Sequence, residues 1–280
     1  MDIVACRVAW WYPLGIMPKT GKKWALVTGG AKRIGAEISL RLAEDGYNIY
    51  LHYRSSKEEA EAVKKKAESY GAHVTLVSGD LSDAKAVEGI FKSISPDVVV
   101  NNAAAFAVSK PEKNSLSAIL KAEEEAFRVN MSANALGPLL VTKAALYRMQ
   151  QEGKGGTFVF IGDAAIHGSG DAYTGDKDAY IMSKAFVPFL TRHRAQELGK
   201  EGFFFYSLLN GPIEPPPGAP KGTVKKVAQD LNIPKEFLNP WLGGSAVAKA
   251  VSLLLKMAPG VNGISVPVDG ARGRVTPREH

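Results

Sequence analysis

The chain has 280 residues, 45% of them hydrophobic, and a formal net charge of +7 at pH 7. This length and composition suit one α/β domain with a substantial core, and the basic balance favours an anionic ligand. The lysines are scattered along the chain, which argues against nucleic acid as a partner. The single cysteine excludes an internal disulfide framework. The five histidines do not have the spacing of metal ligands, so we expect no metal site. No apolar run reaches the roughly 20 residues of a membrane span, so we expect no membrane partner.

Residues 1–20 precede the first predicted strand. They have neither the basic segment nor the long apolar core of a signal peptide. We expect an N-terminal extension that is disordered or lies upstream of a true start at Met17. One catalytic domain over residues 21–280, in a cytoplasmic protein, is the expectation.

A glycine-rich turn follows the first short apolar strand, Trp24–Val27. The turn is Thr28-Gly29-Gly30-Ala31-Lys32-Arg33-Ile34-Gly35, and an amphipathic helix comes after it. A strand, a glycine turn and a helix place backbone N–H groups and a helix N-terminus where a phosphate can bind. The alternative is a tight strand-to-helix turn without a ligand.

The second predicted strand, Tyr47–Tyr53, ends in the sequence His52-Tyr53-Arg54-Ser55-Ser56. A site that prefers NAD usually has a carboxylate here for the ribose hydroxyls. An arginine and two hydroxyls suit a 2′-phosphate instead, which a carboxylate would repel. Ser55 or Ser56 is also a candidate N-cap of the next helix, and both roles can coexist. We therefore favour NADP over NAD.

Two further strands are predicted at His73–Ser78 and Pro96–Val100. The first ends at Gly79-Asp80-Leu81, where Asp80 would face an adenine amine or belong to the N-cap region of a helix beginning near Ala84. The second ends in the small residues of Asn101-Asn102-Ala103-Ala104-Ala105-Phe106. Small residues let a cofactor approach the backbone closely, which would leave Phe106 beside the nicotinamide.

The rest of the chain continues the alternation of strand and helix. A helical pattern runs from Ser115 to Gln151, and strands are predicted at Thr157–Gly162, Phe203–Leu209 and Ile264–Val268. This alternation predicts a doubly wound, mostly parallel seven-stranded sheet with helices on both faces.

A tyrosine and a lysine lie four residues apart at Tyr180 and Lys184, which places them on one face of a helix. A nearby ammonium favours the phenolate, so such a pair can exchange a proton with a substrate oxygen or nitrogen. Tyrosine and lysine also fall four apart by chance in many helices. A second pair, Tyr173 and Lys177, lies in a glycine- and aspartate-rich loop, so Tyr173 is the weaker candidate.

These motifs together resemble the short-chain dehydrogenases/reductases from about Lys22 to Arg274. The motifs occur in the family's order: the turn Thr28–Gly35, Asp80-Leu81, Asn101-Asn102-Ala103, Asn134, Tyr180-x-x-Ser183-Lys184, Gly211-Pro212-Ile213 and Val268-Asp269-Gly270. The resemblance implies a Rossmann-type fold, a nicotinamide cofactor and hydride transfer. It also implies a homotetramer or a dimer, with interface helices near residues 115–150 and 180–200.

Within that family the chain is most similar to the pteridine reductases. Arg33 inside the glycine turn, the strand ending Leu51-His52-Tyr53-Arg54-Ser55 and Phe106 match them, and Asp163 stands where most of the wider family has serine. An ionised carboxylate would oppose the negative charge that grows on a ketone oxygen, but it suits a heterocycle with N–H donors or a ring nitrogen that must be protonated. A raised pKa would make Asp163 a donor, and the alternative is that it only caps the loop after its strand.

The sequence also departs from the family pattern. The route from Asp163 to Tyr180 is longer than usual, which puts the placement of Asp163 in doubt. A stiff proline run, Glu214-Pro215-Pro216-Pro217, opens a predicted substrate lid at about residues 213–243. Phe237 and Trp241 in this lid would cover a flat ring or only pack the lid on the core.

We therefore expect an NADPH-dependent oxidoreductase similar to pteridine reductases, acting on a pterin- or folate-type heterocycle. The expected catalytic residues are Asn134, Asp163, Tyr180 and Lys184, and the substrate-binding residues are Arg33, Phe106 and Asp163. The expected cofactor-binding residues are Gly29, Arg33, Ile34, Gly35, His52, Tyr53, Arg54, Ser55, Ser56, Asp80, Leu81, Asn102, Ala103, Tyr180, Lys184, Gly211 and Ile213. The alternatives are a carbonyl reductase, such as a β-ketoacyl-thioester reductase, and a non-catalytic protein that senses NADP.

Overall fold

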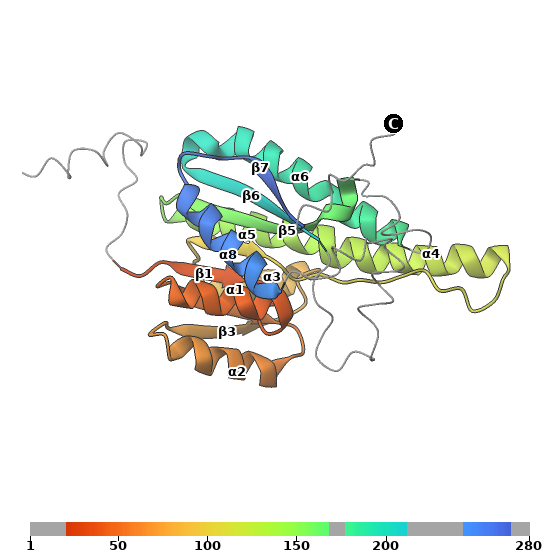
Figure 1. Ribbon diagram of the computed structural model, residues 1–280, viewed down its shortest axis with the longest axis horizontal. Helices are drawn as coiled ribbons and strands as arrows, with labels where there is room; N and C mark the ends of the chain where they lie inside the picture. The colour runs from red at the N-terminus through yellow and green to blue at the C-terminus, as the bar shows by residue number, and fades with distance from the viewer. Residues whose placement is uncertain (1–20, 168–176, 212–242, 270–280) are drawn as a thin grey trace, which may run out of the picture.

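One parallel sheet organises the protein (Figure 1). The computed structural model describes residues 21–167, 177–211 and 243–269. Seven strands pair in the order β3-β2-β1-β4-β5-β6-β7, and every neighbouring pair is parallel. The strands are β1 Trp24–Val27, β2 Asn48–Tyr53, β3 Val74–Ser78, β4 Val98–Asn101, β5 Gly156–Asp163, β6 Phe203–Asn210 and β7 Ile264–Val268. The predicted doubly wound fold is confirmed, with strand boundaries shifted by a residue or two.

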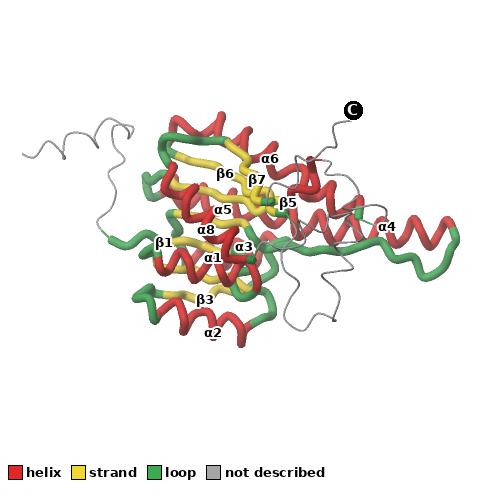
Figure 2. Tube along the Cα trace, viewed as in Figure 1, coloured by secondary structure: helices red, strands yellow, loops and turns green. Residues whose placement is uncertain are grey.

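Helices cover both faces of this sheet (Figure 2). The α-helices are α1 Arg33–Glu44, α2 Lys57–Glu68, α3 Ala84–Ser93, α4 Leu116–Met131, α5 Gly137–Gln151, α6 Asp178–Leu198 and α8 Gly244–Met257. Buried residues of α1, α2 and α8 join one core cluster, and those of α3, α5 and α6 join the other. The two clusters lie on opposite faces of the sheet, because side chains alternate between faces along β1 and β4. Each face of the sheet therefore has its own hydrophobic core.

The helical run predicted from Ser115 to Gln151 is interrupted. A π-helical segment, η1 at Ser132–Leu136, separates α4 from α5. Pro138 has no backbone N–H and cannot give the α-helical hydrogen bond to the carbonyl of Asn134, which favours a local change of helix type. The interruption therefore falls on a predicted catalytic residue.

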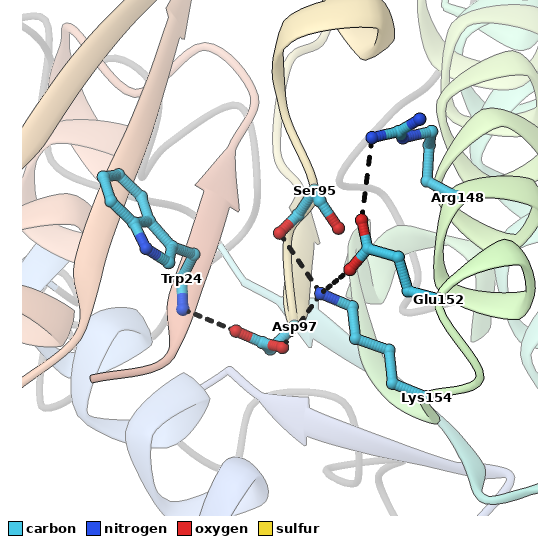
Figure 3. Close-up of polar contacts among 6 residues, drawn as sticks. All are labelled: Trp24, Ser95, Asp97, Arg148, Glu152 and Lys154. Atoms are coloured by element: carbon cyan, nitrogen blue, oxygen red, sulfur yellow. Dashed lines mark hydrogen bonds and ion pairs between the residues drawn. The ribbon is translucent and has the colours of Figure 1, made fainter. Parts of the chain in front are cut away.

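A partly buried polar network joins the amino ends of β1, β4 and β5 (Figure 3). The backbone N–H of Trp24 donates to Asp97 at 2.8 Å, and the ammonium of Lys154 lies 3.1 Å from the other oxygen of that carboxylate. Lys154 also donates to the carbonyl of Ser95 and pairs with Glu152, 3.2 Å away. Because these contacts lie at the amino ends of the strands, the carboxyl ends are left to form the site.

The described residues contain no membrane-crossing helix and no cluster of metal-binding side chains. No helix within 21–167, 177–211 and 243–269 is both long and apolar enough to span a bilayer. The same ranges hold no group of three or more His, Cys, Asp or Glu side chains placed to bind a metal ion. The predicted N-terminal extension and Tyr173 lie outside the described residues, as do Ile213 and the lid residues 213–242 with Phe237 and Trp241.

Candidate active site

Tyr180 and Asp163 are hydrogen-bonded to each other. Tyr180 lies in the first turn of α6, and Asp163 is the last residue of β5. The phenol donates to Oδ2 of Asp163 at 2.8 Å, and Oδ1 of the same carboxylate accepts the backbone N–H of Ala165 at 2.9 Å. Asp163 is buried, with 7% of its surface exposed. The carboxylate therefore caps the loop after β5, one alternative that the sequence left open, and also faces the tyrosine.

Lys184 lies one turn after Tyr180 on the same face of α6. Its ammonium donates to the carbonyl of Ile161 at 3.2 Å and lies 6.0 Å from the centre of the Tyr180 ring. Burial lowers the pKa of Lys184 to about 8, against the opposing effect of the negative charge of Asp163. A buried lysine with this pKa remains mostly protonated at neutral pH and is sensitive to any charge placed beside it.

Asn134 joins three parts of the site. Its amide nitrogen donates to Ser183 Oγ and to the carbonyl of Ala105, each at 2.9 Å, and its Oδ1 accepts the N–H of Ala105 at 2.8 Å. Ser183 in turn donates to the carbonyl of Tyr180 at 2.6 Å. The π-helical segment, the chain after β4 and helix α6 are thereby held together. Ser183 belongs to the sequence motif that contains Tyr180 and Lys184, and the motif alone assigns it no role.

Phe106 lies against the tyrosine. The two rings meet edge to face, with centroids 4.6 Å apart and planes at 79°. More than half of the Phe106 side chain is exposed, at 56%. An aromatic side chain that is more than half exposed has surface available to stack on a flat ligand.

The glycine turn needs residues without a side chain at two positions. Gly29 has φ +61°, and a Cβ there would lie 3.1 Å from Cα of Ala103. A Cβ on Gly35 would lie only 2.1 Å from the carbonyl oxygen of Gly29. Arg33 between them has φ +50° although it is not glycine, which costs about 1–2 kcal/mol of backbone strain. Such strain is often found where a backbone is shaped for a ligand.

Hydrogen bonds between Thr28, Gly29 and the chain after β4 hold this turn in place. Thr28 Oγ1 accepts the backbone N–H groups of Asn102 at 2.8 Å and Ala103 at 3.0 Å. The Asn102 amide donates to the carbonyls of Thr28 at 2.9 Å and Gly29 at 3.3 Å. Asn102 and Ala103 therefore line the turn by fixing its backbone.

His52 contacts the backbone of the glycine turn and of the chain after β3. It is buried, its Nδ1 accepts the N–H of Gly29 at 3.1 Å, and its Nε2 lies 3.0 Å from the carbonyl of Gly79. A backbone N–H only donates and a carbonyl only accepts, so the ring is the neutral tautomer with hydrogen on Nε2. Burial lowers the pKa of His52 and favours this neutral form. Both ring nitrogens contact the backbone, so His52 supports the turn from beneath.

Arg54 extends from the end of β2. Its side chain is 72% exposed, and one guanidinium nitrogen lies 3.7 Å from Asp80. Hydrogen bonds from Ser82 hold the Asp80 carboxylate and lower its pKa. Ser56 stands at the N-cap position of α2 without a side-chain capping bond, whereas Asp83 caps α3. Ser56 is therefore the N-cap residue of α2, as one alternative predicted, but its hydroxyl makes no capping hydrogen bond.

The remaining predicted residues surround this centre. Ile34 and Tyr53 are half-buried against one core, and Leu81 packs against the other. Ser55 is exposed beside Arg54. Gly211 donates its N–H to Val268 at 2.9 Å, and a Cβ on it would lie 2.8 Å from Cα of Asp269.

Comparison with known proteins identifies the family of the chain. The sequence model of the family described as short chain dehydrogenase matches residues 23–221. The 3-oxoacyl-(acyl-carrier-protein) reductase FabG of Staphylococcus aureus is 30% identical over 196 residues, which cover 68% of this chain and 74% of that protein. General stress protein 39 of Bacillus subtilis is 29% identical over 219 residues, covering 74% of this chain and 71% of that protein.

Solved structures share the fold. Acetoin dehydrogenase YohF from Salmonella typhimurium has a TM-score of 0.74 at 23% identity, covering 93% of this chain and 99% of that chain. The angucycline C-6 ketoreductase LanV, solved with bound NADP, has a TM-score of 0.73 at 23% identity, covering 89% and 94%. The glycine turn, Tyr180 and Lys184 all lie at the carboxyl edge of the parallel sheet. Because the family model also matches most of the chain, the chain belongs to the short-chain dehydrogenase family.

Proposed function

We propose that the protein is an NADPH-dependent reductase that transfers a hydride to a C=N bond, or to a conjugated C=C–C=N system, in a pterin- or folate-type heterocycle. The observation that carries this proposal is the hydrogen bond of 2.8 Å between the Tyr180 hydroxyl and the Asp163 carboxylate. It supports a site with a carboxylate beside the proton donor, where a ketone reductase would need a second donor.

The ends of β1 and β2 fit a dinucleotide. Gly29 and Gly35 let the turn pack closely against Ala103 and against itself, and the first turn of α1 contains no acidic residue that would repel a phosphate. Arg33 and the backbone of this turn would bind the pyrophosphate. NADPH bound there would supply the hydride.

The preference for the phosphorylated cofactor rests on the end of β2. Arg54, Ser55 and Ser56 would bind the 2′-phosphate, since the guanidinium is exposed and its ion pair with Asp80 is long, at 3.7 Å. An exposed ion pair of this length contributes little and is readily exchanged for a phosphate. Asp80 would then face the adenine side.

The proton would come from the Tyr180–Asp163 pair. Tyr180 would donate to the ring nitrogen, and Asp163, when protonated, would replace the proton across the 2.8 Å contact. Lys184 would bind the nicotinamide ribose and favour the tyrosinate with its charge. Asn134 would hold the chain after β4 and Ser183 in register with this pair, as its contacts to Ala105 and Ser183 allow.

Phe106 and Arg33 would bind the flat substrate. The exposed part of the Phe106 ring would stack on the heterocycle, and the contact between Phe106 and Tyr180 would place the heterocycle near the proton donor. Arg33, exposed at the glycine turn, would reach the polar edge of the ring.

Reduction of a carbonyl is the second candidate. FabG, which is 30% identical, is named as a 3-oxoacyl reductase, and LanV is named as a ketoreductase. If Asp163 stays protonated, its hydroxyl would donate to a carbonyl oxygen and the objection to this chemistry would disappear. The relatives favour this second candidate, and the Asp163 carboxylate favours the first.

We also propose that the protein is a homotetramer or a dimer. Exposed apolar side chains follow α5 and α6, among them Tyr147 at 62%, Met182 at 58% and Phe189 at 69%. Apolar exposure of this kind on neighbouring helices supports an interface between copies. Light scattering coupled to size exclusion tests it, and a monomer at micromolar concentration would refute it.

The Tyr180→Phe variant tests the proposed reaction. The variant should still bind NADPH. Its rate of dihydropterin or dihydrofolate reduction should fall at least about 100-fold, because it lacks the proton donor. Turnover at the full rate would show that Tyr180 is not the acid, and Tyr173 would then be the next candidate.

A further inference from the structure

A second asparagine stands one turn before Asn134 on the same face of the helix. Asn130 is completely buried, with 0% of its surface exposed. Its amide nitrogen donates to the carbonyl of Ala107 at 2.7 Å, and its Oδ1 accepts the N–H of Ala107 at 3.0 Å. Asn134 makes the same two bonds to Ala105, at 2.9 and 2.8 Å.

The two asparagines therefore hold alternate residues of one extended segment. Figure 1 shows the chain after β4 running beside α4, and the four amide bonds join them. In an extended segment the backbone N–H and C=O of the residue between two such residues point to the other side, and its side chain lies on the opposite face from the two flanking side chains. Phe106 is that middle residue, held through the backbone of its two neighbours, and its ring meets Tyr180.

A buried amide needs partners in any protein, so its satisfaction alone does not indicate a role. What distinguishes Asn130 is the identity of its partner. Its two bonds fix the residue directly after Phe106, whereas Asn134 fixes the residue directly before it. We call these two pairs of hydrogen bonds, from Asn130 to Ala107 and from Asn134 to Ala105, the clamp on residues 105–107. Without the pair from Asn130, the segment would be held only at the residue before Phe106.

We propose that Asn130 is a positioning residue that presents Phe106 to the substrate. It acts through the backbone of Ala107 and touches neither cofactor nor substrate. The stacking of the substrate on Phe106 rests on the proposed function, whereas the clamp on residues 105–107 does not depend on it.

The kinetic test is a double-mutant cycle on the full chain. Asn130→Ala should raise KM for dihydropterin about tenfold while NADPH affinity changes by less than about twofold, and Phe106→Ala should raise KM by at least as much. In the Phe106→Ala background, Asn130→Ala should have no further effect on KM. Asn48→Ala is the matched control, because Asn48 is also buried, with 6% of its surface exposed, and accepts the N–H of His73 at 3.0 Å at the other end of the sheet. It should leave KM unchanged in both backgrounds.

Hydrogen exchange tests the clamp without any substrate. In Asn130→Ala the amides of residues 103–109 should exchange at least tenfold faster than in the native chain, and in Asn48→Ala they should not change. Asn130→Ser, which keeps a polar group in the buried position, replaces the alanine variant if the latter does not fold. Unchanged exchange in 103–109, or effects of Asn130→Ala and Phe106→Ala on KM that multiply, would overturn the proposal. The native chain could fail to reduce the pterin while exchange in residues 103–109 still rises in Asn130→Ala. The proposed substrate would then be wrong, and the proposal that Asn130 holds residues 105–107 would stand. The double-mutant cycle would then be run with the carbonyl substrate that the native chain reduces.

Discussion

The hydroxyl of Tyr180 donates to the carboxylate of Asp163 across 2.8 Å, at the point where β5 ends and α6 begins. The two oxygens can hold one transferable proton between them, and a negative charge on one opposes a negative charge on a substrate oxygen beside it. This pair would therefore assist reduction of a C=N bond, in which a nitrogen takes up the proton. An ionised Asp163 would hinder reduction of a carbonyl, in which negative charge grows on oxygen.

Replacing Asp163 by serine should change the preferred substrate. The hydroxyl of Asp163→Ser keeps a polar group at the end of β5 but offers a donor in place of a carboxylate. We expect kcat/KM for dihydropterin to fall at least tenfold and kcat/KM for an acetoacetyl thioester to rise, as steady-state assays would measure. A parallel loss of both activities would mean that the carboxylate only caps the loop through the N–H of Ala165.

Arg54→Ala should reduce the preference for NADPH over NADH. Loss of a guanidinium on the 2′-phosphate typically costs about 1.5–3 kcal/mol, so the ratio of the two kcat/KM values should fall roughly tenfold to 100-fold. Lys65→Ala on the exposed face of α2 is the control and should leave the ratio unchanged. Equal NADPH affinity in native and Arg54→Ala proteins would refute the assignment of the phosphate.

His52 should act on the cofactor through the glycine turn. In His52→Asn the amide oxygen can still accept the N–H of Gly29, and in His52→Gln the amide nitrogen can still donate to Gly79. We expect NADPH affinity to fall less in the asparagine variant than in the glutamine variant, as fluorescence titration would measure. The reverse order would show that the contact with Gly79 matters more for the turn.

The same histidine predicts how stability depends on pH. Burial lowers the pKa of His52 in the folded state, so the unfolded chain takes up a proton first as the pH falls below about 6.5. Stability should therefore decrease from about pH 6.5 downward until the folded pKa is passed. Urea titrations of the native and His52→Asn proteins would measure this effect. The difference between their free energies of unfolding should become smaller as the pH falls below about 6.5. A difference that does not change with pH would contradict the burial of a neutral ring.

Lys184→Met should stabilise the protein without cofactor while it impairs catalysis. The pKa of Lys184 falls from 10.5 to about 8 on folding, so its charge destabilises the folded state by at most about 3 kcal/mol below pH 8. This cost decreases as the pH rises from about 8 to 10.5. Thermal unfolding should accordingly show a gain for Lys184→Met at pH 7 that shrinks toward pH 10, and a uniform loss of stability would contradict it.

The network around Lys154 should affect stability alone. Lys154→Met leaves the Asp97 carboxylate with the N–H of Trp24 but without its ammonium partner, in a site where the lysine side chain is 15% exposed, which costs about 1–3 kcal/mol. The melting temperature should fall by several degrees, and kcat and KM should stay within about twofold, because the network lies at the amino ends of the strands. A large kinetic effect would indicate coupling across the sheet.

The sequence was sufficient to predict the fold because strands, glycine turn and helices follow one another with clear periodicity. The pairing of Tyr180 with Lys184 was also predictable, since a helix fixes residues four apart. The contacts of His52 and Asn130 were not, because their partners lie 27 and 23 residues away and are backbone groups, which leave no signature in the sequence. The π-helical segment likewise depends on how Pro138 and Asn134 are packed between α4 and α5.

The most direct test of the central claim is NADPH oxidation, followed by absorbance, with a dihydropterin and an acetoacetyl thioester offered in parallel. The Asp163–Tyr180 contact predicts turnover of the dihydropterin, with kcat/KM at least tenfold above that of the thioester. Turnover of the thioester alone would contradict the account, and it would mean that Asp163 is protonated or structural and that the protein reduces carbonyls.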